Sequence, residues 1–253
     1  MKKLYLSLVC LFVTISAQAA QTNEQFRFET YWSGFKVAEM FVVANQTDSD
    51  YNLVVTINSE GIAKLASNYS SVNSVSGAVV GGKFKPKIYN SRWWRKDEKQ
   101  NIELRFSPKG EVVSESLIPP ERVGKRPIVE KEFKQNVVDP VSAAFVSRET
   151  IRVALKKNPN SRAVFAVPTF DAKRRFDTII AIKGYKKIQI GGKMQNLLHI
   201  NLRRQPVAGF RDKELVEMQE DQQTIDFYLN KNLVPVWGSA KAQMGSATIK
   251  LVK

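Results

Sequence analysis

Charged side chains gather in the segment FDAKRRFD, residues 170–177, between two apolar runs. Asp171 or Asp177 could act as a general acid or base. The neighbouring Lys and Arg side chains could instead bind an anion. The flanking runs, residues 164–170 and 174–182, alternate apolar and polar side chains and therefore predict two strands. We interpret the residues between these strands as the tip of a hairpin, where solvation alone explains the charges.

Two tryptophans stand side by side in the segment NSRWWRK, flanked by Arg92 and Arg95. In a strand, Trp93 and Trp94 must point to opposite faces, so one can enter the interior while the other is exposed or lines a cavity. An indole beside cations suits a sugar ring or a lipid headgroup. We treat these four residues as candidate ligand-binding residues. The alternative is that neighbouring layers cover both rings.

Few residues offer nucleophilic or metal chemistry. Cys10 is the only cysteine and His199 the only histidine, so a zinc site lacks partners. A nucleophilic triad would need His199 as its base, and alternation places His199 on the face of Leu197, Asn201 and Arg203. Paired carboxylates of the segment ELVEMQEDQQTIDF could hydrolyse a glycan, but we interpret them as part of an exposed turn before a strand. They are Glu217, Glu220, Asp221 and Asp226. We predict no catalytic residue, no metal site and no cofactor.

The N-terminus has the pattern of an export signal. A basic pair at residues 2–3 precedes an apolar run at residues 4–16, which is too short to span a bilayer, and residues 17–19 read AQA, a small-x-small cleavage site. We predict a signal peptide over residues 1–19. Because Cys10 lies inside it, the exported chain would contain no cysteine and no disulfide.

The chain is basic, with 39 Lys and Arg against 24 Asp and Glu and a net charge of +15, of which +13 would remain after cleavage. In an exported protein the expected counterparts are an anionic lipid, a lipoprotein, an acidic envelope glycan or an envelope protein, and not nucleic acid. The alternative is that the excess charge is spread over solvated strand faces. No later segment has the ~18 uninterrupted apolar residues of a membrane-spanning helix.

Apolar and polar side chains alternate along most of the chain, which is typical of strands with one buried face. Roughly a dozen such runs, separated by turn residues, predict a mainly β fold. Examples are residues 51–58, 102–106, 198–202, 225–229 and 249–251.

One segment has the helical pattern instead. Asp139 is a suitable N-cap and Pro140 suits the first helical position, so we predict one main helix over about 140–157. Before it, residues 117–139 form a long, proline-containing connection. Residues 20–253 therefore form either a single β-rich domain or two lobes that meet at this connection.

Arg148 falls in the middle of the apolar face of the predicted helix. A buried guanidinium needs a carboxylate partner, and Asp171 and Asp177 are the candidates, since they flank a strand that the helix could cover. The alternative is that Arg148 extends past its apolar neighbours to water.

Residues 35–44 are apolar on both faces, which a single-layer sheet with one wet face does not accommodate. A second layer could cover the second face, but one helix of about 18 residues is only ~27 Å long. We therefore expect the sheet to curl around an apolar cavity. Met40 and either Trp93 or Trp94 should line this cavity, with Lys and Arg side chains at its mouth.

Several segments resemble the landmarks of one family of exported bacterial proteins, domain of unknown function 3108. They are DPVSAAFVSR (139–148), FDAKRRFD (170–177), LVPVW (233–237), and the earlier YWSGFKVAEM and GGKFKPKIYNSR. The family usually has a glycine where this chain has Ala172, which leaves the turn type there open. The resemblance implies a strongly curved, incompletely closed antiparallel sheet, a half-barrel similar to the periplasmic lipoprotein-carrier barrels, with a helix packed on or in it. Such half-barrels often hold an acyl chain, although fold alone does not establish that use.

Together these observations favour a non-enzymatic protein of the periplasm that binds an amphipathic envelope component, either a lipid or the acyl part of a lipoprotein. The first alternative is a protein-interaction module that contacts an envelope assembly through its basic face. The second alternative is a glycan-active enzyme.

Overall fold

The computed structural model describes residues 21–220, 224–242 and 245–252, so the predicted signal peptide, residues 1–19, lies outside the described residues. The first half of the sheet contains β1 (Thr22–Trp32), β2 (Phe35–Gln46), β3 (Asp50–Ser59), β4 (Tyr69–Val80), β5 (Lys83–Arg95), β6 (Glu98–Phe106) and β7 (Val112–Ile118). The second half contains β8 (Val164–Phe170), β9 (Arg175–Ile190), β10 (Lys193–Ala208), β11 (Thr224–Leu229), β12 (Pro235–Ala242) and β13 (Gly245–Leu251). The helices are α1 (Gly61–Ser67), the 3-10 turn η1 (Lys131–Lys134), α2 (Pro140–Lys157) and α3 (Asp212–Glu220).

These thirteen strands form one sheet in the order β7-β6-β5-β4-β3-β2-β1-β13-β12-β11-β10-β9-β8. All neighbouring pairs are antiparallel, and the two halves join where β1 pairs with β13, for example at Phe28 and Leu251. The edge strands β7 and β8 do not pair with each other, so the sheet is not closed. The prediction of a mainly β, incompletely closed antiparallel sheet is confirmed.

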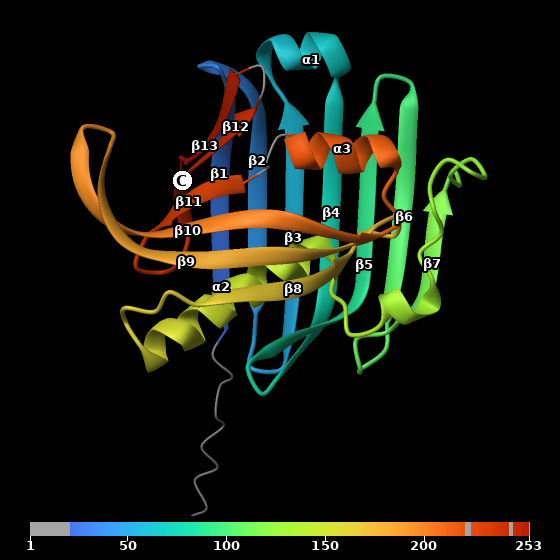
Figure 1. Cartoon of the computed structure of the whole chain (residues 1–253), viewed down its shortest axis with the longest axis horizontal. Helices are drawn as coiled ribbons and strands as arrows, with labels where there is room; N and C mark the ends of the chain where they lie inside the picture. Colours follow the sequence, from blue (N-terminus) through green and yellow to red (C-terminus); the bar gives the residue numbers. More distant parts are fainter. Residues whose placement is uncertain (1–20, 221–223, 243–244, 253) are drawn as a thin grey trace, which may run out of the picture.

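The sheet folds over on itself around α2. In Figure 1, β8, β9 and β10 run across the earlier strands, and α2 lies beside both sets. The helix packs against β3, β4 and β5 of the first half and against β8 and β9 of the second half. Curling therefore buries the inner face of each half against the helix and against the other half, as the two-sided apolar pattern of β2 requires.

The connection between β7 and α2 spans the gap between the two edge strands. At its end, the Val137 N–H donates to the Gly110 carbonyl beyond β6, while the Val138 N–H donates to the Pro168 carbonyl of β8. Earlier in the connection, Arg126 donates to the Gly209 carbonyl at 2.8 Å and to Glu214 at 3.3 Å. Residues of the connection thus join two edges that no strand pairing joins.

The predicted helix over about 140–157 is confirmed as α2, Pro140–Lys157. The Asp139 carboxylate accepts hydrogen bonds from the N–H groups of Val141 and Ser142, both at 2.9 Å, and so caps two donors that the helix itself leaves unpaired. Val141, Ala143 and Ile151 are buried and fix the helix between the two halves.

The predicted hairpin tip is also confirmed. One Asp171 oxygen accepts from the N–H groups of Lys173 (3.0 Å) and Arg174 (2.7 Å), and the other accepts from the Arg174 guanidinium. Ala172 has a φ of 74°, the left-handed conformation that favours glycine. This conformation accounts for the glycine that the resemblance places at the same position.

One element contradicts its prediction. The segment before β11 is not an exposed turn, because residues 212–220 form α3. Glu214 in its first turn accepts from the backbone N–H of Arg211 at 2.9 Å. Burial raises the pKa of Glu214, but this bond and the neighbouring guanidinium groups outweigh burial and lower the pKa to about 2. An acidic first turn favours a helix, and this signal lay in the sequence.

Candidate functional site

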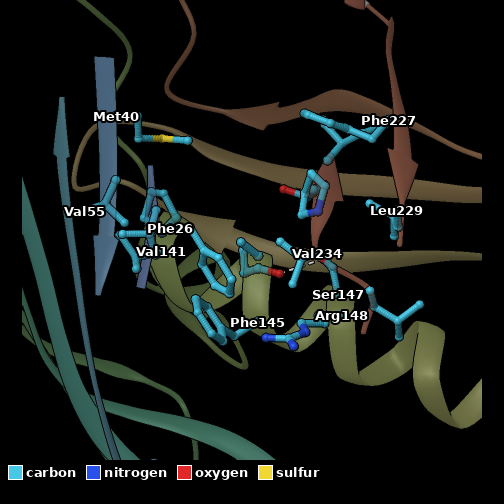
Figure 2. Close-up of a pocket in the computed structure, with 18 of the residues that line it drawn as sticks. Phe26, Met40, Val55, Val141, Phe145, Ser147, Arg148, Phe227, Leu229 and Val234 are labelled. Carbon is cyan, nitrogen blue, oxygen red and sulfur yellow. Dashed lines mark hydrogen bonds between the residues drawn. The ribbon is translucent and has the colours of Figure 1, made fainter. Parts of the chain in front are cut away.

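A cavity of about 490 Å³ lies between the two halves of the folded sheet, with α2 as its third wall. Figure 2 shows Phe26, Met40 and Val55 on one side of it, Phe227 and Leu229 on the other, and Val141 and Phe145 rising from α2. Alternation explains this lining, because every second residue of each strand faces the interior. The apolar lining residues on strands include Phe26, Phe28, Met40, Val42, Val55, Ile57, Ile180, Ile200, Leu202, Phe227 and Leu229.

Some of the lining side chains are less buried than their position on the inner face would suggest. Met40, Val55 and Phe227 are only half-buried, although all three point inward. Their remaining exposed surface borders the cavity itself. The apolar area that faces this space is available to an apolar ligand.

The polar side chains that line the cavity have partners within the described chain. Asn73 accepts from the Tyr89 hydroxyl at 3.2 Å and donates to Ser71 at 3.3 Å. The Ser147 hydroxyl donates to the carbonyl of Ala143 at 2.6 Å. Because these groups are engaged, the cavity favours apolar contact over hydrogen bonding.

Arg148 is the one charged residue among those that line the cavity. The predicted partners are wrong: its guanidinium bonds both carboxylate oxygens of Glu24, at 2.5 and 2.8 Å, and the carbonyl of Asn232 at 2.9 Å. The side chains of Arg148 and Glu24 are 17% and 32% exposed, so the ion pair is partly buried. The hydrogen bond from Arg148 is the main reason why the pKa of Glu24 lies below its ordinary value.

The two aspartates that we had expected near Arg148 have local partners instead. Asp171 is engaged within its own turn, and Asp177 pairs with Arg175, two residues earlier on β9, at 2.8 Å. Neither aspartate is a hydrogen-bond partner of Arg148.

Comparison with known proteins places the chain in a family. The sequence profile of DUF3108, described as a protein of unknown function, matches residues 27–252. The chain belongs to the DUF3108 family. No curated protein matches its sequence. Its structure is similar to that of a β-barrel-like protein of domain of unknown function DUF1849 from Brucella abortus, with a TM-score of 0.51 and 12% identity over 91% of this chain and 96% of that one. At this identity the likeness concerns the fold alone.

In this DUF3108 protein the tryptophan segment does not reach the cavity. Trp93 is half-buried and Trp94 is 40% exposed, and neither is among the lining residues. Arg92 and Arg95 are exposed and also lie outside the lining. The expectation that one tryptophan lines the cavity is therefore wrong, whereas Met40 does line it. Trp93 pairs in register with Gln100 of β6, toward the β7 edge and beyond the cavity wall.

Asp139 is a buried group that the sequence indicated only as a cap. It is fully buried beside Ser142, whose hydroxyl contacts the Tyr51 hydroxyl at 2.9 Å. Burial raises the pKa of Asp139 to about 6, against the opposing effect of the hydrogen bonds from Ser142 and Val141. Asp139 does not line the cavity, although Pro140 and Val141 do. We therefore assign its perturbed carboxyl to the helix cap and not to ligand binding.

His199 has a defined environment on the second half of the sheet. Its Nε2 lies 2.7 Å from an Asp226 oxygen, and its ring stacks on Tyr228 with centroids 4.8 Å apart. Ile200 and Leu202 line the cavity, but His199 and Asp226 do not. Of the other proposed glycan carboxylates, Glu217 is exposed on α3 and Asp221 lies outside the described residues.

Two features are absent from the described residues. No group of three or more His, Cys, Asp and Glu side chains is placed there to hold a metal ion. Across the same residues, no helix is long and apolar enough to cross a membrane.

Proposed function

We propose that this DUF3108 protein is an exported, non-enzymatic protein of the cell envelope that holds the acyl part of an amphipathic component, a lipid or a lipoprotein, in its interior cavity. The observation that carries the proposal is the apolar cavity of about 490 Å³ between the two sheet halves and α2. This volume lies within the range of small-molecule sites, roughly 300–1,000 Å³. The leader at residues 1–19 supports export to the periplasm.

The chemistry of the lining supports an acyl chain over other ligands. A sugar or a nucleotide would leave its hydroxyl or phosphate groups without partners, because Asn73, Tyr89 and Ser147 in the lining already have hydrogen-bond partners within the chain. An alkyl chain needs no hydrogen-bond partners, and each methylene group that it buries contributes about 0.8 kcal/mol to the free energy of binding. The one lining cation, Arg148, is neutralised by Glu24 and does not attract an anion into the cavity.

Catalysis is not part of the proposal. Asp139, a buried carboxyl near the cavity whose pKa is raised to about 6, is engaged as a helix cap, and His199 lies outside the lining. A protein-interaction module would gain nothing from a hollow interior, since filled cores are more stable than cavities. The cavity thus favours the binding of a ligand over the two alternatives.

Titration with an environment-sensitive fatty-acid probe tests the proposal. We expect saturable binding to the purified exported chain. The variant Ala144→Trp places an indole in the cavity, because Ala144 lines it and its side chain is exposed. This variant should weaken probe binding at least about tenfold.

Ala66→Trp is the matched control. Ala66 lies on α1, is exposed and is absent from the cavity lining, so the same indole there should leave probe affinity within about twofold. Absence of saturable binding to the unmodified chain would reject the proposal. Equal weakening by both tryptophan variants would place the probe somewhere other than the cavity.

A further inference from the structure

A second pocket adjoins the apolar cavity at the middle of α2. It has a volume of about 540 Å³ and shares two wall residues, Arg148 and Leu233, with the cavity. Figure 2 shows Arg148 at the edge of the cavity, on α2. The side chains of Arg148 and Leu233 therefore separate an apolar space from this second pocket, which we call the basic pocket.

The basic pocket carries a net positive charge. Arg148, Arg152 and Lys156 follow one another at intervals of four residues on α2, so they share one face of the helix. Lys231, from the turn between β11 and β12, supplies a fourth cation. Glu24 is the one carboxylate among the residues that line the pocket.

Partners for these cations are unevenly distributed. Glu24 bonds Arg148, and Glu149 pairs with Arg152. Lys156 and Lys231 are exposed and form no ion pair with any residue that the structure describes. Two ammonium groups at one pocket thus lack a counter-charge from the described chain, and each can donate up to three hydrogen bonds.

We propose that the basic pocket binds the anionic headgroup, a phosphate or a carboxylate, of the same molecule whose acyl chain occupies the cavity. The inference rests on the proposed function. Arg148, which is paired with Glu24, lines both the cavity and the basic pocket. A headgroup that extends past this ion pair into the basic pocket therefore meets Lys156 and Lys231. Leu155 and Tyr185 line the same pocket and provide apolar contact for the glycerol or first methylene groups.

Competition between two single-chain lipids tests this assignment. Lysophosphatidylglycerol and a monoacylglycerol of the same chain length differ in their headgroup charge. Each is titrated as a competitor against a neutral pyrene-labelled monoacylglycerol bound to the exported chain. We expect the anionic lipid to bind at least about tenfold more tightly, with an advantage that shrinks as salt rises. The variant Lys156→Gln/Lys231→Gln should remove most of that tenfold preference and leave the affinity for the neutral lipid unchanged.

Lys99→Gln/Lys109→Gln is the control for net charge. Both lysines are exposed, and neither is among the residues that line the cavity or the basic pocket, so the headgroup preference should stay within about twofold. If neither lipid binds, the proposed function itself fails. If both lipids bind equally, acyl binding stands and the headgroup assignment is overturned.

The anionic group in the basic pocket could instead belong to a small, free anion that has no acyl chain. Glycerol phosphate should compete far more weakly than lysophosphatidylglycerol, because it gains no burial in the cavity. If glycerol phosphate binds as tightly as the lipid, and Ala144→Trp does not affect it, the basic pocket is a site for small anions and the proposal is overturned.

Discussion

The interior of the folded sheet has a filled part and a hollow part. In the filled part, Leu53, Leu104 and Phe170 come from three different strands and are at most 1% exposed. In the hollow part, Met40, Val55 and other inward residues remain half-buried around a cavity of about 490 Å³. The same alternation of apolar and polar residues produces both parts. Burial of a face and filling of the space behind it are therefore separate properties of a curled sheet.

The chain connections explain the contrast. At the filled part, the end of the long connection inserts buried Val129 and Val137 between the two sheet edges, and Phe170 packs with them. The hollow part has only α2 as its third wall, and the small side chains of Ala143, Ala144 and Ser147 face it. The inner surface there is continuous, but no large side chain fills the space. Selection for stability alone would favour a larger side chain, so the hollow part is consistent with a ligand site.

The largest expected effect compares the same substitution in the two parts. Leu104→Ala leaves a new cavity in a packed core and should lower the free energy of unfolding by about 3–5 kcal/mol. Leu202→Ala enlarges an existing cavity and removes fewer contacts, so it should cost about 1–2 kcal/mol. Urea unfolding measures both values. Equal losses would mean that the space around Leu202 is as tightly packed as that around Leu104.

The Arg148–Glu24 pair, on the boundary between the cavity and the basic pocket, should give the next largest effect. Arg148→Met leaves a partly buried carboxylate unpaired, and we expect a loss of about 2 kcal/mol, between the values for exposed and fully buried pairs. Arg105→Met is the control, because the pair of Arg105 with Glu103 is 52% and 40% exposed and should contribute less than about 0.5 kcal/mol. Thermal unfolding of both variants checks the difference. A loss for Arg148→Met no larger than the control would show that the pair is effectively solvated.

Asp139 should give a smaller, pH-dependent effect. Its pKa is raised to about 6 in the folded protein, so folding favours the protonated form, and this contribution to stability is lost as the pH rises through 6. Asn keeps an oxygen acceptor for the helix cap but does not titrate. Between pH 5 and 8, Asp139→Asn should therefore gain on the order of 1 kcal/mol relative to the unmodified chain. Parallel stability curves for the two proteins across that range would contradict the raised pKa.

The fold could be predicted from the sequence to a large extent. Alternation gave the strands, and the Asp139-Pro140 pair gave the start of α2, because both signals are local. The apolar pattern of residues 35–44 on both faces predicted a curled sheet. The helix α3 was missed, since the acidic segment at residues 214–227 was interpreted as an exposed turn before a strand.

The site was harder to predict, because it depends on contacts between distant segments. Met40 could be assigned to the lining from alternation. Trp93 is on the inner face by the same alternation, but the cavity does not extend to its part of the sheet. The partner of Arg148 had a signal that we did not use. Glu24 is a lone carboxylate on the face that also carries Phe26 and Phe28. The negative charge of Glu24 on an apolar strand face could have been paired with the positive charge of Arg148 on the apolar helix face.

The most direct test of the central claim is native mass spectrometry of the protein after gentle purification from its own host. The unmodified chain and Ala66→Trp should each carry one co-purifying acylated molecule, while Ala144→Trp should be recovered without it, because its indole occupies the cavity. Recovery of the unmodified chain without any bound acylated molecule would contradict the account.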